Sequence, residues 1–364
     1  MKTIMFILAL LLGMYAAQAE ILKVASNGTQ QYSQISAAIG AASPSDTILV
    51  LGGGYSGFVV DKKLVLIGAG TGVGIGEGVL INGTVEVLDN ADSTELRSLW
   101  IRSNPANGSS DSLGAVLRIR SGATKVFVWR CFVENYSSSA SGVTTCWAGV
   151  NSQAEFVQCT FWGSDVADAS GGNGVLYRSG SNLTLQSCVF ANIERGIHAF
   201  SATTGASCLV SHCVFTTENS NLYPVSGAIA GVAENCAIMS ESGYSNLYTS
   251  GISYSYCAYS NQAPPGATHV AATPAAFVNL VLADARASDY HVAGGSVVQD
   301  AGNPMSPFDL DGSRADIGIY GGQHPYVDGG VPDYPFAVQV EVPYSAPLNG
   351  TMRIWGRGRV GPGN

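Results

Sequence analysis

A block ending in Cys-x-apolar recurs along the middle of the chain and limits the fold more than any other feature. Its full pattern is apolar-x-apolar-x-x-Cys-x-apolar, and successive cysteines lie 21 to 29 residues apart. Self-similarity at a period of 20 to 50 residues is typical of solenoids, in which each repeat packs against its neighbours. The six copies are centred on Cys131, Cys159, Cys188, Cys213, Cys236 and Cys257, and a cysteine-free copy precedes them at Thr94, Leu96, Leu99 and Ile101.

The spacing inside each block predicts two short strands separated by a bend. Alternate apolar residues, such as Val126 and Val128, turn one face of a strand inward. The two-residue gap before the cysteine reverses this phase, so we expect the bend there. A column of glycines, which suit tight turns, is expected to open a third strand in each coil: Gly149, Gly174, Gly196 and Gly227.

Coils of three strands can bury their apolar face by stacking at the roughly 4.8 Å spacing of a sheet. The sequence therefore predicts an all-β right-handed parallel β-helix over residues 20–275, with a cysteine ladder beside a ladder of Phe, Ile and Tyr. A β-sandwich is the alternative, but its antiparallel hairpins need a period of about 8 to 12 residues, roughly half of that observed.

Eight cysteines would suggest disulfides if the chain is exported. In-register neighbours on parallel strands, however, lie near 4.8 Å with parallel Cβ vectors, farther apart than the roughly 3.5 to 4.5 Å that a bridge prefers. Cys208 also fits an inward apolar position, and Cys146 lies near a turn. We expect mostly free, buried thiols that act as small apolar groups.

The two ends of the solenoid need covers. Apolar residues at helical spacing between Tyr32 and Ala42, ended by Pro44, predict a short N-terminal capping helix. Residues 276–324 are interpreted as a C-terminal closing segment of the β-helix. The prolines that follow indicate a linker and a short β extension over residues 325–364.

The N-terminus and the charge predict where the chain acts. Lys2, the apolar run 4–12 and Ala17-Gln18-Ala19 match a signal peptide over residues 1–19, cleaved after Ala19. We expect a secreted or cell-surface monomer without a transmembrane segment in the mature chain. The net charge of −9 argues against nucleic acid, whereas a polysaccharide or cell-surface glycan fits as a partner.

Segments at both ends resemble a known fold family. Near the start these are Tyr32-Ser33-Gln34-Ile35, Asp46-Thr47-Ile48, Gly54-Tyr55 and Leu64-Val65-Leu66-Ile67-Gly68; near the end they are Asp289-Tyr290-His291-Val292 and Asp316-Ile317-Gly318-Ile319-Tyr320-Gly321-Gly322. The chain resembles pectate-lyase-like right-handed β-helix proteins of the secreted bacterial type over residues 30–322. That fold hosts lyases, hydrolases, epimerases and non-enzymatic adhesins, so the resemblance implies the fold and leaves the activity open.

The charged residues of the chain can be compared with the groups that two carbohydrate-cleaving reactions need. A uronic-acid lyase needs a base and a cation, and a glycoside hydrolase needs two carboxylates about 5 to 10 Å apart. Asp165 and Asp168 are the candidate pair, but they lie in a Gly-rich loop, and the paired-Asp and Gly-His-Gly motifs of polygalacturonases are absent. The weak catalytic candidates are Arg118, Arg120, Arg178, His198, Asp165 and Asp168; lone charges on outward strand positions are more often simply solvated.

Asp309, Asp311 and Asp316, with Gly312, partly resemble a Ca²⁺ loop. The third early ligand and the distal Glu of an EF-hand are missing, and a turn capped by Asp side chains is the alternative. No cofactor is required by the sequence.

The leading hypothesis is a β-helix that binds carbohydrate or surface partners along its side face, without a recognisable catalytic site. The alternative is a polysaccharide lyase, or less favourably a hydrolase, with a divergent site between Arg118 and His198. The two are distinguished by whether the candidate residues converge on one surface of the folded chain.

Overall fold

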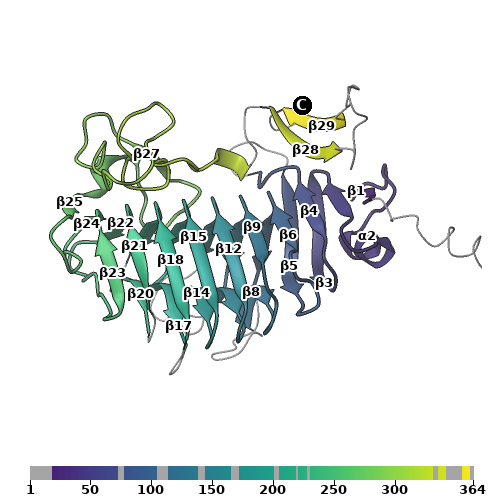
Figure 1. Cartoon of the computed structure of the whole chain (residues 1–364), viewed down its shortest axis with the longest axis horizontal. Helices are drawn as coiled ribbons and strands as arrows, with labels where there is room; N and C mark the ends of the chain where they lie inside the picture. The colour runs from purple at the N-terminus through teal and green to yellow at the C-terminus, as the bar shows by residue number, and fades with distance from the viewer. Residues whose placement is uncertain are drawn as a thin grey trace, which may run out of the picture.

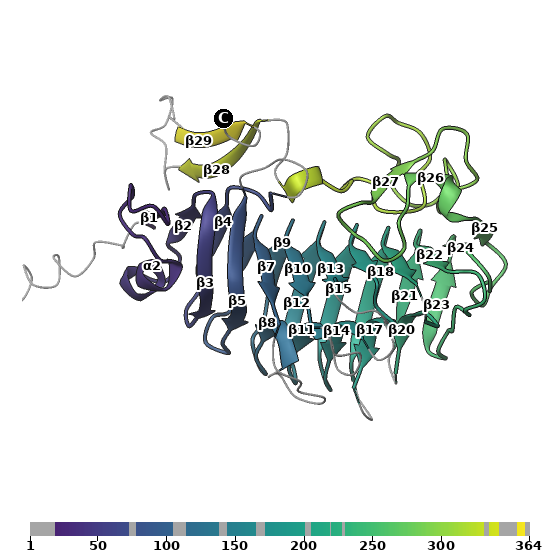
Figure 2. The same cartoon turned by 180° about the vertical axis from the view of Figure 1, so that it is seen from behind.

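A computed structural model describes residues 19–72, 78–104, 114–137, 144–164, 172–200, 205–218, 220–227 and 230–330, together with the backbone of two later strands. Stacked coils of short parallel strands form a right-handed β-helix, which confirms the predicted fold class (Figures 1 and 2). Apart from Ala19, the predicted signal peptide lies outside the described residues. None of the described helices is long and apolar enough to cross a membrane.

One wall of the β-helix, sheet A, contains ten strands that pair in parallel. Its inward column runs through Leu96, Val128, Phe156 and Leu185, while alternate residues face outward. Its strands are β1 (Ile21–Val24), β2 (Thr47–Val50), β4 (Val65–Gly68), β6 (Glu95–Arg97), β9 (Val126–Trp129), β12 (Gln153–Val157), β15 (Asn182–Gln186), β18 (Ser207–Ser211), β21 (Ala230–Glu234) and β23 (Ile252–Ser255).

The second large sheet bends into two walls, named here face B and face C, and the long strands β3 (Gly53–Val60) and β5 (Val79–Val87) run across both. Face B contains β7 (Trp100–Ser103), β10 (Phe132–Asn135), β13 (Thr160–Gly163), β16 (Val189–Ala191), β19 (Val214–Thr217), β22 (Ala237–Ser240), β24 (Ala258–Tyr259) and β25 (Val270–Ala271). Face C contains β8 (Ala115–Ile119), β11 (Thr144–Ala148), β14 (Asn173–Tyr177), β17 (Arg195–Ala199) and β20 (Tyr223–Ser226). The prediction of three strands per coil is confirmed for the central coils.

The predicted bend before each ladder cysteine is made by a single residue in the left-handed region. The φ angle is 55° at Arg130, 57° at Gln158 and 53° at His212, each directly before its cysteine. This conformation is uncommon for residues with a Cβ. It turns the chain from sheet A into face B, and the cysteine follows at the corner.

The predicted internal ladders are present. All eight cysteines are free and buried. Beside them the Phe161 and Phe190 rings stack at 5.0 Å between centroids, and Phe190 and Phe215 stack at 4.7 Å. Offset stacking of this kind adds about 0.5–1.5 kcal/mol per pair beyond area burial.

The predicted glycine column is wrong in part. Gly149 and Gly227 follow β11 and β20, whereas Gly174 and Gly196 lie inside β14 and β17. A Cβ at Gly174 would come within 2.4 Å of the Phe190 ring. The prediction thus fails for Gly149 and Gly227, whereas Gly174 and Gly196 stand at the second position of their strands and leave room there for the phenylalanine ladder.

The predicted N-terminal cap is confirmed as helix α2 (Ile35–Ala41). Ile35, Ala38 and Ile39 are buried at its inner side. The Lys62 ammonium donates to the carbonyl oxygens of Ile39 (3.1 Å) and Ala42 (3.3 Å) near the helix C-terminus, where a cation is favourable. The helix thus covers the apolar end of the first coils.

Beyond β25 the chain folds back along face B, as Figures 1 and 2 show. Gly318 N–H donates to Asn235 O (3.0 Å), Tyr326 OH lies 2.7 Å from Thr160 Oγ1, and Thr71 N–H donates to Gly329 O (2.8 Å). The segment therefore runs from the last coils toward the first, and its contacts continue past the predicted boundary at residue 324.

The elements of this returning segment are η2 (Pro274–Ala276), β26 (Phe277–Asn279), β27 (Asp289–Val292) and η3 (Asp328–Gly330). After it, β28 (Pro335–Glu341) and β29 (Trp355–Val360) pair antiparallel.

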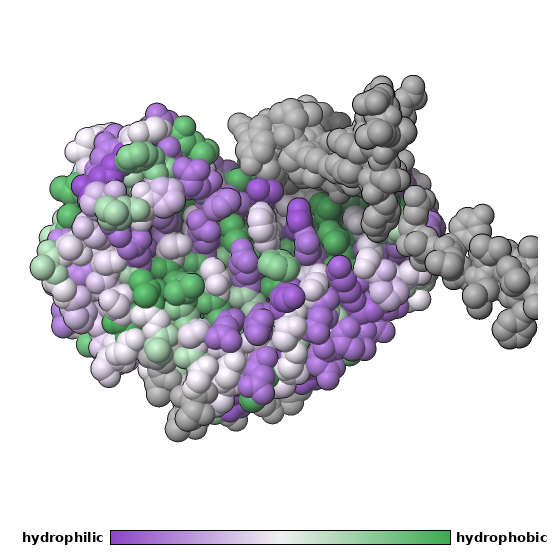
Figure 3. Space-filling model, in the orientation of Figure 1, coloured by the Kyte–Doolittle hydropathy of each residue, from purple (hydrophilic) through white to green (hydrophobic). Residues whose placement is uncertain are grey.

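The returning segment buries the outer side of face B. Phe277 and Ile317 pack against outward residues such as Val214 and Ala237. Strands buried on both sides lose the alternation of buried and exposed residues, and every residue of β19 and β22 is buried. Much of one expected side face is thus occupied by the chain itself, while sheet A shows hydrophilic and apolar side chains intermixed (Figure 3).

Candidate functional site

Four of the residues predicted from the sequence lie on the outer side of face C. Arg118 and His198 share one outward column that also contains Trp147 and Leu176. They are three strand steps apart, roughly 14 Å at the usual strand spacing. Arg118 Nε donates to Ala115 O (3.1 Å).

Arg120 and Arg178 directly follow β8 and β14, and the two strands are two steps apart, roughly 10 Å. Arg120 forms an ion pair with Glu86 on β5. The Arg178 guanidinium lies 4.3 Å from the centre of the Phe200 ring. The predicted basic residues therefore lie on one surface, on the coils of β8, β14 and β17.

A further arginine lies at this surface. Arg195 opens β17, where it pairs in register with Asn173. It forms an ion pair with Glu194 (2.8 Å) and lies 5.7 Å from the Tyr223 ring centre. Aligning Asn173-Gly174 with Arg195-Gly196 in the sequence would have placed it correctly.

His198 forms a side-chain hydrogen bond on this surface. Its Nδ1 lies 2.8 Å from Ser226 Oγ. Burial, with a smaller contribution from the charge of Arg195, lowers the pKa of His198 to about 4. The imidazole is therefore neutral at neutral pH, and the positive charge of face C comes from its arginines.

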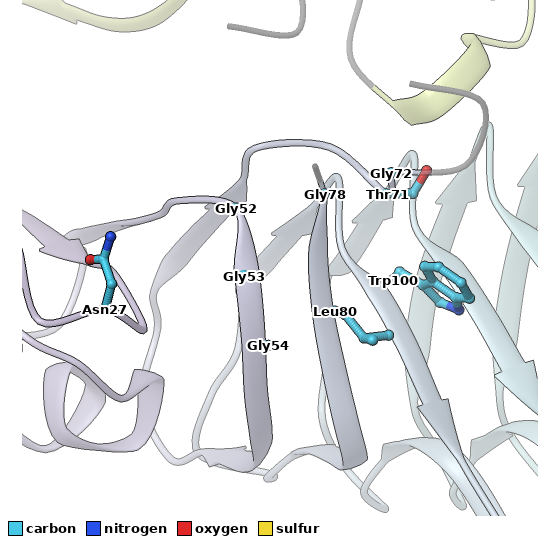
Figure 4. A pocket seen from close by; sticks show the side chains of 9 residues that line it. All are labelled: Asn27, Gly52, Gly53, Gly54, Thr71, Gly72, Gly78, Leu80 and Trp100. Atoms are coloured by element: carbon cyan, nitrogen blue, oxygen red, sulfur yellow. The ribbon is translucent and has the colours of Figure 1, made fainter. Parts of the chain in front are cut away.

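A second candidate region contains two neighbouring cavities, one beside the first coils and one where the returning segment meets face B. A cavity of about 470 Å³, named here the Trp100 cavity, is lined by the indole of Trp100, by Leu80 and Asn27, and by backbone at Gly52–Gly54 (Figure 4). A neighbouring cavity of about 240 Å³, the Asp289 cavity, is lined by Phe132 and Thr160 of face B and by Arg286, Ser288, Asp289, Tyr290, His291, Tyr326 and Asp328 of the returning segment. Thr71 lines both cavities.

No family model and no curated protein matches this sequence. Among solved structures, the chain is similar to the pectate lyase Pel9A, with 15% identity over 84% of this chain and 97% of that chain and a TM-score of 0.45. It is also similar to a pectin methylesterase from carrot, with 14% identity over 66% of this chain and 71% of that chain and a TM-score of 0.36. At such identities the likeness concerns the fold alone, which the strand pairing of this chain already establishes.

The two predicted carboxylate candidates, Asp165 and Asp168, lie outside the described residues. Their proposed pairing across a sugar therefore stays a prediction. Of the six weak catalytic candidates, the structure places the three arginines and the histidine, and all four lie on face C.

The carboxylates of the predicted Ca²⁺ loop accept backbone hydrogen bonds. Asp309 Oδ2 accepts from Asp316 N–H (2.9 Å), Asp311 Oδ1 from Ser313 N–H (2.9 Å) and Asp316 Oδ1 from Asp300 N–H (2.7 Å). These contacts match the turn-capping alternative. Among the described ranges, no three His, Cys, Asp or Glu side chains are grouped to hold a metal ion, and calcium binding stays a prediction.

Proposed function

We propose that this protein is exported and binds acidic polysaccharides through face C. The observation that carries the proposal is the gathering of Arg118, Arg120, Arg178 and Arg195 on one wall of a chain with a net charge of −9. A polymer lying across the strands would meet these arginines on the coils of β8, β14 and β17. Binding, without cleavage, is the simplest function of such a surface.

The chemistry of arginine supports an acidic partner. The guanidinium group donates paired hydrogen bonds to carboxylates and also stacks on aromatic rings. On face C the rings of Phe200 and Tyr223 lie beside Arg178 and Arg195. The aromatic neighbours would hold the guanidinium groups in place and offer apolar surface to sugar rings.

The other two walls are less suited to a long anion. Face B is covered by the returning segment. Sheet A carries Glu95, Glu155 and Glu234 on its strands, interspersed with Arg97. Face C is the wall on which cations predominate among the described residues.

The test compares binding of polygalacturonate with binding of an uncharged galactan by calorimetry. We expect the wild-type chain to bind the acidic polymer, and the double variant Arg178→Gln/Arg195→Gln to bind it at least about tenfold more weakly, since a charged hydrogen bond contributes roughly 1.5–3 kcal/mol. Lys23→Gln removes one charge from an exposed position on sheet A and should leave the affinity unchanged.

The salt dependence of binding gives a second test of the proposal. Binding should weaken as the salt concentration rises, because exposed charges are screened within about 10 Å at 0.1 M salt. Equal affinity for the uncharged galactan, or equal loss of affinity in Lys23→Gln and in the arginine double variant, would overturn the proposal.

The alternative function is a uronic-acid lyase that uses the same wall. It is favoured by one observation: neutral His198 lies on face C with arginines that could neutralise a substrate carboxylate. An absorbance assay for unsaturated uronides, run on a panel of acidic polysaccharides with and without Ca²⁺, separates the two. Product formation that is lost in His198→Ala would establish the lyase.

A further inference from the structure

We propose that removal of residues 1–19 stabilises the first coil, because the α-ammonium group that it creates at Glu20 pairs with the buried carboxylate of Asp46. The inference rests on the export step of the proposed function and is separate from carbohydrate binding. It concerns the end of the solenoid where β1 and helix α2 lie together (Figure 1).

Asp46 is a buried carboxylate without a cation. It is 4% exposed, and its oxygens accept backbone N–H groups, Oδ1 from Glu20 (2.7 Å) and Oδ2 from Ser43 (2.7 Å). Within the described part of the chain, no basic side chain forms an ion pair with it. Carboxylates are rarely buried unpaired, since removing a charge from water is costly. Asp46 therefore calls for a cation at a position that the uncleaved chain leaves neutral.

The lysines of the first coils do not supply this charge. The Lys62 ammonium pairs with Asp61 (3.6 Å) and donates to carbonyl oxygens at the end of helix α2. Lys23 and Lys63 are exposed and form no ion pair among the described residues. The cation has to come from a group that already touches the carboxylate.

Cleavage between Ala19 and Glu20 creates the missing charge. An endopeptidase of the export machinery hydrolyses this peptide bond with one water molecule, so Ala19 gains a carboxylate oxygen and the nitrogen of Glu20 becomes an amine. The ordinary pKa of an α-amino group is about 7.7–8.0, so the amine takes up a proton at neutral pH. A charge-assisted hydrogen bond is roughly twice as strong as a neutral one.

The fold holds the new terminus beside Asp46. Thr47 N–H donates to Glu20 O (2.8 Å), and Ile21 pairs in register with Thr47 of β2. Leu22 is buried and anchors β1 in the core. All of these contacts lie after the cleavage point, so they persist when residues 1–19 are removed.

The test compares two forms of the mature chain that differ only in the charge of the terminus. Both begin at Glu20; one has a free α-amino group, and the other is acetylated, which keeps an N–H group for Asp46 but removes the charge. We expect the free form to unfold at a higher urea concentration at pH 6.5. Asp46→Asn should abolish this difference, whereas Asp61→Asn, which removes a carboxylate from an exposed position, should preserve it.

The difference between the two forms should depend on pH in a defined direction. Pairing with Asp46 raises the pKa of the α-ammonium in the folded chain. Its contribution is therefore fully present below about pH 7.7, and it is lost as the pH rises through the folded value. The free and acetylated forms should unfold at the same urea concentration above about pH 10.

The reactivity of the terminus gives a measurement that does not depend on any variant. Only the unprotonated amine reacts with acetic anhydride, so the pH profile of the labelling rate, followed by mass spectrometry, gives the pKa of the terminus. We expect a midpoint at least about one pH unit above that of a synthetic peptide of residues 20–26, which corresponds to about tenfold slower labelling at pH 6.5. Steric shielding alone would slow labelling at every pH without moving the midpoint.

Three results would overturn the inference: equal urea midpoints for the free and acetylated forms, a difference that persists in Asp46→Asn, or a labelling midpoint equal to that of the peptide. The mass of the exported chain checks the cleavage itself, and a first residue other than Glu20 would also contradict it. Failure to bind polygalacturonate would leave the stability difference unchanged, so failures of the two proposals can be told apart.

Discussion

At the residue scale, the ladder cysteines act as small core side chains that also satisfy backbone carbonyls. Cys188 Sγ lies 3.4 Å from Phe156 O and 3.3 Å from Gln186 O. Burial raises the pKa of Cys131 to about 12. A cysteine in an unfolded chain has a pKa of about 8.5, so the folded state binds the thiol proton more tightly.

This difference predicts an alkaline loss of stability. The folded pKa lies above the unfolded one, so the contribution is fully present below about pH 8.5 and is lost as the pH rises toward 12. Urea unfolding under reducing conditions should show a falling free energy of unfolding from pH 8 to pH 10.5. As a control, the native chain at pH 8 should not react with a thiol reagent, and the unfolded chain should expose eight thiols. Rapid labelling of the native chain would contradict the prediction.

The apolar alternation of the sequence predicts the positions of some residues and not of others. Alternation placed Val126 and Val128 inward correctly, because a strand has a period of two. Alternation gave no position for Arg195, because Gly196 and Ile197 both point inward and interrupt the alternation in β17. Local pattern rules fail where a glycine changes the course of the strand.

At the element scale, β14 and β17 require glycines because phenylalanine rings from the opposite wall fill the space beside them. A Cβ at Gly196 would lie 2.4 Å from the Phe215 ring and 2.7 Å from Pro224 O. The neighbouring coil repeats the arrangement with Gly174 and Phe190. Phe190 and Phe215 of face B thus fill the space that side chains at these two positions of face C would occupy.

Gly196→Ala is therefore expected to destabilise the chain by about 1–3 kcal/mol, the usual cost of overpacking a core. Denaturant unfolding followed by circular dichroism measures the change. Gly294→Ala is the matched control, because a Cβ there meets no atom within 4 Å and its φ is not in the left-handed region. A Gly196→Ala variant as stable as this control would show that the Phe215 ring moves aside freely.

At the scale of the whole molecule, the returning segment couples the last coils to the first. Trp162 Nε1 donates to Ala283 O (2.9 Å), Thr216 Oγ1 donates to Leu282 O (2.8 Å), and Ser98 Oγ donates to Gly330 O (2.5 Å). Contacts in a solenoid otherwise join only neighbouring coils. The segment should make unfolding more cooperative than in a simple array of repeats.

Ile317→Ala tests this coupling. Ile317 is fully buried between the returning segment and face B. Its truncation should cost about 2–5 kcal/mol. It should also increase the binding of a hydrophobic dye below the main unfolding transition, as the outer side of face B becomes exposed. Val278→Ala, at a position that is 59% exposed on β26, should change neither measurement.

The sequence by itself determined the solenoid, its three strands per coil, its inward ladders and its N-terminal cap, because each depends on a short period or on helical spacing within a few residues. The tertiary structure decided which walls stay open. The return of residues 272–330 along face B depends on contacts between residues more than 100 positions apart, such as Trp162 with Ala283. It likewise decided that the predicted basic residues share face C, and it created the Trp100 and Asp289 cavities, because residues meet there only when coils stack and the chain folds back upon them.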